Sequence, residues 1–180
     1  MEKDIYLLPI GVVEEPLLEA VAQELEAIFR RPCRIGEGLP DPTYAYDGRR
    51  KQYRVEAIMA RLRLLDLPRA HRLLGLVDRD CYTPGLNFIF GQAIIGGREA
   101  IVALPRLRQG FYGLPEDQVL FHERTVKEAV HELGHTYGLR HCGDPRCVMC
   151  FSNSLADTDA KGASFCPACR GELVEVLKNL

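Results

Sequence analysis

One segment constrains the fold of this 180-residue chain more than any other: HELGHTYGLRH, from His131 to His141. His131 and His135 are four residues apart, so on an α-helix their imidazoles lie on one face, about one turn apart. A helix that continued to His141 would carry the third imidazole to another side. Gly138 accepts a positive φ, which lets the chain turn sharply back. The segment therefore predicts a helix that ends near Gly138 and three imidazoles that meet.

Three imidazoles with one open position are typical of a catalytic zinc site, in which water takes the fourth position. Glu132, next to His131, would lie over that position as the general base. It would take a proton from the zinc-bound water and later pass one to the leaving group. The bare H-E-x-x-H pattern arises by chance in about one chain in a hundred, and the extended pattern in roughly a few in 10⁵. We predict a zinc site that hydrolyses an amide.

Five of the seven cysteines lie between Cys142 and Cys169. An odd number of cysteines in a chain without a visible export signal favours metal binding over disulfides. Two closely spaced pairs offer four thiolates, which bind zinc tetrahedrally at about 2.3 Å and leave no open position. We predict a second, structural zinc that stabilises a segment too small for its own apolar core. Its expected ligands are Cys142, Cys147, Cys166 and Cys169.

The fifth thiol, Cys150, is left over by this assignment. It could replace Cys147 as a ligand, although the turn around Met149 is expected to point it elsewhere, and a set of unligated cysteines is a further alternative. Two outlying cysteines and two further histidines match no ligand spacing, so we expect them in the core or on the surface. They are Cys33, Cys81, His71 and His122.

The composition is that of a soluble globular protein, with 47% hydrophobic and 27% charged residues. A formal net charge of −2 provides no basic field for a phosphate backbone, so we expect no nucleic-acid partner. No stretch approaches the roughly 20 apolar residues of a spanning helix, and no export signal is visible. We expect a cytoplasmic monomer that does not bind membranes.

The hydrophobic pattern alternates between strand and helix, which is typical of an α/β fold. A turn at Gly96 and Gly97 joins the last two predicted strands, so these pair antiparallel and make the sheet mixed. The edge strand should come from residues 86–95, and residues 38–48 read as an exposed loop. The predicted strands are residues 4–11, 33–36, 72–78, 86–90 and 99–104. The predicted helices are residues 15–31, 54–65, 115–138 and 167–180.

The run HELGHTYGLRHC, followed by GDPRCVMC and FCPAC, resembles the archaemetzincins, also called archaelysins, which are minimal members of the metzincin clan of zinc metallopeptidases. The close match covers about forty residues, and the upstream segment GLVDRDCYTPGLNFIFGQA is also similar. By this resemblance Met149 corresponds to the clan's Met-turn, a methionine beneath the catalytic metal. Taken alone, a methionine there would more often fill a gap in the core.

The resemblance implies one metzincin-like catalytic domain over residues 1–180. It implies a twisted mixed sheet with helices in an upper lobe of about residues 1–138. The lower lobe, about residues 139–180, would be small, rich in Cys and held together by zinc. Two Zn²⁺ would bind per chain, one catalytic and one structural. A peptide or protein substrate would lie in a cleft between the lobes, antiparallel to the upper-lobe edge strand.

Several alternatives stay open at the level of sequence. The enzyme could be a metalloendopeptidase or resemble an aminopeptidase. Rival readings are a zinc-binding interaction module with a vestigial helix site, and a zinc hydrolase that acts on a non-peptide amide. No transition-state stabiliser can be assigned, because Tyr137 points off a different helix face from His131 and His135 and is expected to serve packing.

Overall fold

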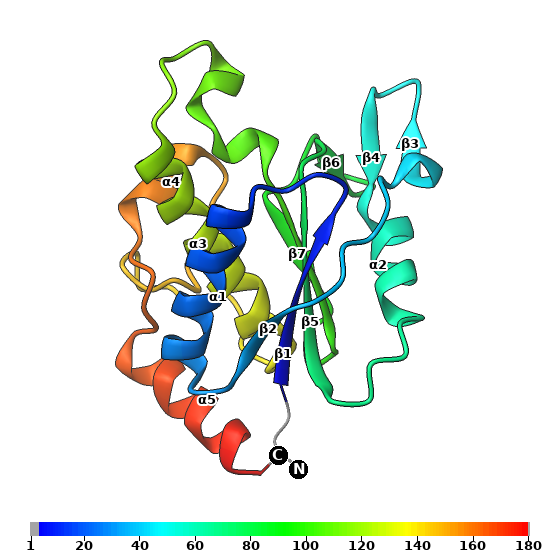
Figure 1. Cartoon of the computed structure of the whole chain (residues 1–180). Helices are drawn as coiled ribbons and strands as arrows, with labels where there is room; N and C mark the ends of the chain where they lie inside the picture. The colour runs from blue at the N-terminus through cyan, green and yellow to red at the C-terminus, as the bar shows by residue number, and fades with distance from the viewer. Residues whose placement is uncertain (1–3, 180) are drawn as a thin grey trace.

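The computed structural model describes residues 4–179, and a five-stranded sheet forms its centre (Figure 1). Its strands are β1 Asp4–Ile10, β2 Cys33–Ile35, β5 Ala70–Val77, β7 Gly91–Ala93 and β8 Glu99–Ala103. They lie in the order β2, β1, β5, β8, β7, and only the β7–β8 pair is antiparallel. The predicted mixed sheet of an α/β fold is therefore confirmed.

Helices cover both faces of this sheet (Figure 1). The three long helices before residue 138 are α1 Glu15–Phe29, α2 Val55–Arg63 and α3 Gln118–Thr136. On β5, Leu74 and Leu76 join the apolar core formed with α1 and α3, whereas Leu73 and Val77 join the core formed with α2. Successive side chains of a strand point to opposite faces, so a strand covered on both faces is apolar throughout.

The predicted helices are confirmed, with small differences at their ends. The first helix ends at Phe29 because Arg30 adopts a left-handed conformation, φ 52°, before the chain reaches Pro32. Helix α3 begins after Asp117, whose carboxylate accepts a hydrogen bond from the backbone N–H of Leu120. A side-chain cap of this kind satisfies one of the free N–H groups at a helix start.

The edge strand lies where the sequence placed it, but the predicted strand over residues 86–90 is wrong. That segment is irregular, because the Ile89 N–H donates to the Cys81 carbonyl of β6, and bonding to β8 begins only at the Phe90 carbonyl, which accepts from the Ala103 N–H. Ile89 and Phe90 are nevertheless buried, which explains the apolar run. The strand β7 follows at Gly91–Ala93, pairs antiparallel with β8 and occupies the end of the sheet.

A second, three-stranded sheet lies beside the first and was missed by the sequence pattern. Its strands are β3 Tyr46–Asp47, β4 Gln52–Arg54 and β6 Cys81–Tyr82. The predicted loop over residues 38–48 is therefore only partly correct. The Tyr82 hydroxyl donates a 2.7 Å hydrogen bond to the Asp47 carboxylate and ties β6 to β3. Strands of two or three residues are too short to show a hydrophobic period.

The C-terminal part is irregular apart from two helices, α4 Leu155–Ala160 and α5 Pro167–Lys178. The sequence predicted α5 and missed α4, which begins with a capping box formed by Ser154 and Asp157. Leu173 of α5 is buried in the same apolar core as α1 and α3. The predicted end of this last helix, Leu180, lies outside the described residues, as do Met1 to Lys3, where no export signal was seen. No helix within residues 4–179 combines the length and apolar composition needed to span a bilayer.

Candidate metal centre

Helix α3 ends in a geometry that turns the chain back. Gly138 has φ +94°, a value that side chains rarely adopt. Its N–H donates to the His135 carbonyl, and the Leu139 N–H donates to the Gly134 carbonyl. These two bonds define a Schellman motif, which satisfies the last carbonyls of a helix. The bend predicted at Gly138 is present, and it brings His141 back toward the helix.

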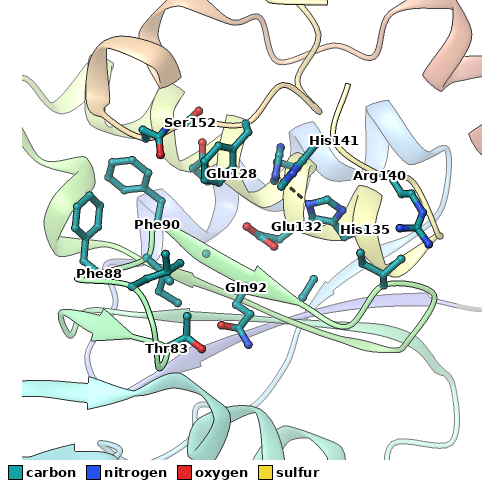
Figure 2. A pocket seen from close by; sticks show the side chains of 18 of the residues that line it. Thr83, Phe88, Phe90, Gln92, Glu128, Glu132, His135, Arg140, His141 and Ser152 are labelled. Atoms are coloured by element: carbon teal, nitrogen blue, oxygen red, sulfur yellow. Dashed lines mark hydrogen bonds between the residues drawn. The ribbon is translucent and has the colours of Figure 1, made fainter. Parts of the chain in front are cut away.

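The three imidazoles of the sequence motif meet at one point, and Figure 2 shows those of His135 and His141. One ring nitrogen from each of His131, His135 and His141 lies within 4.8 Å of the others. The Nε2 atoms of His131 and His135 are 3.1 Å apart. Two nitrogens bound to one tetrahedral zinc lie about 3.3 Å apart, given Zn–N distances of roughly 2.05 Å. The donor set and its spacing fit a single zinc ion.

Backbone carbonyls orient the two buried rings. The Nδ1 atoms of His131 and His135 lie 2.8 Å and 2.7 Å from the carbonyl oxygens of Val148 and Leu139. A carbonyl oxygen only accepts, so each Nδ1 donates and each Nε2 lone pair faces the other imidazoles. Burial lowers the pKa of His131 well below its ordinary value, and burial also lowers the pKa of His135. Both rings are therefore held in the neutral form that binds metals.

Glu132 lies beside this centre and packs against the edge strand β7. A Cβ atom added to Gly91 would lie only 2.6 Å from both Cγ and Oε1 of Glu132. Any side chain at position 91 would therefore displace the carboxylate from the cleft. Burial raises the pKa of Glu132 well above its ordinary value, and the charge of Glu128 raises it further, whereas Lys161 lowers it. Such a carboxylate accepts a proton readily.

A buried ion pair lies one helical turn before Glu132. The Lys161 Nζ is 3.1 Å from Oε1 of Glu128, and the two side chains are 1% and 4% exposed. The same ammonium group donates to the Cys150 carbonyl at 3.2 Å, and the Thr158 hydroxyl donates to Glu128 at 3.3 Å. The pair therefore ties helix α3 to the segment that follows the cysteine-rich turn.

We expect Lys161→Met to lower the free energy of unfolding by about 3–5 kcal/mol, because it leaves the Glu128 carboxylate buried without its partner. Adding Glu128→Gln to this variant should recover much of the loss. Urea denaturation measures both. The matched control is Lys178→Met, whose pair with Glu175 is more than 60% exposed on both sides and should contribute at most about 1 kcal/mol. Equal losses in the two lysine variants would contradict this account.

Met149 lies beneath the helix that carries the histidines. It is fully buried, and a Cβ atom added to Gly134 would lie 2.5 Å from its Sδ. Its carbonyl accepts a 2.9 Å hydrogen bond from the N–H of Cys142, and the preceding Val148 carbonyl faces His131. The residue that the resemblance assigns to a Met-turn therefore packs against α3 at Gly134, which precedes His135 in the chain.

Four thiols form a second candidate metal site. The sulfurs of Cys142, Cys147, Cys166 and Cys169 all lie within 4.8 Å of one another. The sulfurs of Cys142 and Cys166 are 3.8 Å apart, which matches the roughly 3.8 Å between two thiolates on one tetrahedral zinc. The backbone N–H of Cys169 lowers the pKa of Cys166 to about 7. Thiolates, not thiols, bind zinc, so Cys166 is more readily available as a ligand than Cys147 and Cys169, whose pKa values burial raises.

The structure also places the residues that the sequence left outside both sites. Cys150 lies outside the four-thiol group, which favours Cys147 as the fourth candidate ligand. Cys81 is buried and Cys33 packs against the core, as predicted. Tyr137 stacks on Phe29 with ring centroids 5.3 Å apart and is only 2% exposed, so its predicted packing role is confirmed. The histidines outside the three-imidazole group are His71 and His122.

The three imidazoles open onto a cleft of about 630 Å³. Its walls come from residues 83–95, from helix α3 and from the segment after Gly138. Phe88 and Phe90 lie on one side of Glu132, and Arg140 lies beyond His135 on the other side (Figure 2). The cleft therefore extends in both directions from the candidate metal centre.

Sequence reasoning missed four residues of this site. Glu128 could have been found, because it precedes Glu132 by four residues and shares its helix face. Arg140 lies inside the motif but at a position that the pattern leaves free. Gly91 and Lys161 carried no signal, because their roles depend on contacts with residues more than thirty positions away.

The family model for "Peptidase family M54" matches residues 41–175. The chain is also similar to proteins named "Archaemetzincin". It is 39% identical to that of Pyrococcus furiosus, over 98% of this chain and 95% of the relative. It is 41% identical to that of Saccharolobus solfataricus, over 99% and 97%.

Solved structures agree with these sequence matches. The crystal structure of archaemetzincin from Methanopyrus kandleri superposes with a TM-score of 0.84 at 36% identity, covering 97% of this chain and 96% of that one. The structure from Archaeoglobus fulgidus, complexed with malonate, superposes with a TM-score of 0.81 at 37% identity, covering 94% and 99%. The chain belongs to peptidase family M54, the archaemetzincins, a family of zinc metallopeptidases.

Proposed function

We propose that His131, His135 and His141 hold the catalytic zinc of this metallopeptidase and that Glu132 is its general base. The observation that carries the proposal is the convergence of three imidazole nitrogens, two of them neutral Nε2 atoms, on a cleft into which Glu132 also projects. When bound, zinc lowers the pKa of its water to about 7 and polarises the scissile carbonyl.

Glu132 carries the proton in this proposal. Its carboxylate accepts a proton from the attacking water and later donates it to the departing amine. Contact with Gly91 holds the carboxylate in place, and the Glu128–Lys161 pair fixes the preceding turn of α3. Peptide-bond cleavage needs no other proton carrier than this residue.

We propose a second zinc at Cys142, Cys147, Cys166 and Cys169, which gives two Zn²⁺ per chain. Four thiolates leave no position for water or substrate, so this ion is structural. Residues on both sides of position 138 share one apolar core, which supports a single catalytic domain with an upper lobe of about residues 1–138 and a lower lobe of about residues 139–180. The cluster of free thiols suits a reducing compartment, so we place the protein in the cytoplasm. We also propose that it is a monomer.

The edge strand β7 supports a mode of substrate binding. Gly91, Gln92 and Ala93 line the cleft, and β7 pairs with β8 on its other side. An extended peptide laid antiparallel to β7 gains backbone hydrogen bonds and passes the three imidazoles. Because the cleft extends past the metal centre in both directions, we propose a metalloendopeptidase rather than an aminopeptidase.

An unbiased library of peptides with blocked and free termini tests this function. We expect the zinc-loaded protein to cut internal bonds of both sets at similar rates, with products identified by mass spectrometry. Cleavage confined to peptides with a free amino terminus would favour an aminopeptidase instead. Hydrolysis of simple non-peptide amides without any peptide cleavage would favour the alternative of a zinc amidohydrolase.

A further inference from the structure

One end of the cleft carries a positive charge that the hydrolytic machinery does not use. Arg140 is exposed and lines the cleft beyond His135 (Figure 2). Within residues 4–179 its guanidinium joins no ion pair and no side-chain hydrogen bond. By contrast, Arg106, which lies over the Phe88 ring of the cleft wall, donates two hydrogen bonds to the Asp80 carboxylate.

The charge of Arg140 is also not balanced by the acidic residues of the cleft. Of the described residues that line it, only Glu128 and Glu132 are acidic. Glu128 is paired with Lys161, and Glu132 packs against Gly91 near the other end of β7. The guanidinium is therefore available to a ligand that enters the cleft.

The direction of β7 decides which half of a substrate meets Arg140. Glu132 lies beside Gly91 at the start of β7, and the Gly96 N–H, just beyond its end, donates a 2.9 Å hydrogen bond to the His135 carbonyl. The strand thus runs along α3 from Glu132 toward the end where Arg140 lies. A peptide antiparallel to β7 places its amino-terminal half at that end.

We propose that Arg140 selects peptides that carry Asp or Glu on the amino-terminal side of the scissile bond. The inference rests on the proposed function and names its substrate class. Guanidinium pairs with carboxylate through two parallel hydrogen bonds, so an acidic side chain is its natural partner. The opposite end of the cleft presents the apolar rings of Phe88 and Phe90, and the Arg106 guanidinium over the Phe88 ring is already paired with Asp80.

The test uses pairs of peptides with blocked termini. The two peptides of a pair differ only by Asp or Asn at one position on the amino-terminal side of the cleaved bond, and each such position is tested in turn. At low salt we expect kcat/KM to favour the acidic peptide by about two- to fivefold at one of these positions, the range of a partly exposed ion pair. The ratio should approach one as salt is raised to about 0.5 M. A preference for acidic residues only after the cleaved bond would overturn the assignment.

Two substitutions localise the effect. Arg140→Gln should bring the acidic-to-neutral ratio to about one, and Arg140→Glu should make the protein favour Lys over Asp at the same position. The ratio is taken within each protein, so any general change in activity cancels. The matched control is Arg49→Gln, which removes one charge between β3 and β4, outside the cleft, and should leave the ratio unchanged. An unchanged ratio in both Arg140 variants would overturn the proposal.

A binding measurement separates this inference from the proposed function. The same peptides are titrated into zinc-loaded Glu132→Gln protein by fluorescence anisotropy, with and without Arg140→Gln. An acidic preference in binding that depends on Arg140 supports the subsite even if no peptide is cleaved. Peptide cleavage without any acidic preference removes the subsite and leaves the peptidase intact. No binding of any peptide overturns both.

Discussion

Replacing Glu132 with glutamine is expected to lower kcat for peptide hydrolysis by about 10²- to 10⁴-fold, the usual contribution of a general acid–base group. Glutamine has nearly the same shape, so it should keep the contact with Gly91 and leave the three imidazoles in place. It cannot accept the proton of the attacking water. We therefore expect two zinc ions per chain by elemental analysis, together with almost no turnover of a peptide that the native protein cleaves.

The matched control is Glu123→Gln, which removes the same charge from an exposed position on the same helix. It should hydrolyse the peptide at the native rate. If Glu132→Gln and Glu123→Gln are equally active, Glu132 is not the base. If Glu132→Gln instead loses a zinc ion, its carboxylate belongs to the metal site and the proposed division of roles is wrong.

The parts of this site that the sequence predicted are those set by local geometry. Two histidines four residues apart share a helix face wherever that helix is placed, and Gly138 bends the chain through its own φ. The four clustered cysteines are similar, because each pair is closely spaced along the chain. Only the meeting of the two pairs depends on the fold.

The remaining parts depend on contacts between distant segments. Lys161 and Glu128 are 33 positions apart, and neither residue belongs to a sequence pattern that predicts the ion pair. The apolar run over residues 86–90 resembled a strand because Ile89 and Phe90 are buried, yet the Ile89 N–H bonds to β6 and only the Phe90 carbonyl bonds to β8. Burial alone produces the pattern that predicted a strand over residues 86–90, whereas the observed edge strand β7 lies later within the predicted range of residues 86–95. The short helix α4 differs, since its capping box was readable at Ser154.

Replacing Cys166 with serine is expected to remove the structural zinc and with it most of the stability of the fold. A structural zinc contributes roughly 10–16 kcal/mol of binding free energy in small zinc domains, about as much as the whole stability of a typical domain. Serine should start helix α5 as well as Cys166 does at the same N-cap position, so loss of the thiolate is the main change. We expect one zinc per chain and a thermal midpoint lower by more than about 10 °C.

Two comparison proteins make this prediction specific. Cys150→Ser changes a thiol that is half-buried like Cys166 but lies outside the four-thiol group, and should keep both zinc ions and the native midpoint. Replacing His131, His135 and His141 together with alanine should also leave one zinc per chain, but the midpoint should fall much less, because the emptied site is open to solvent and its loss leaves the thiol cluster intact. A Cys166→Ser protein that keeps its midpoint would show that apolar packing of Leu173 and its neighbours, rather than metal, holds the C-terminal segment to α1 and α3.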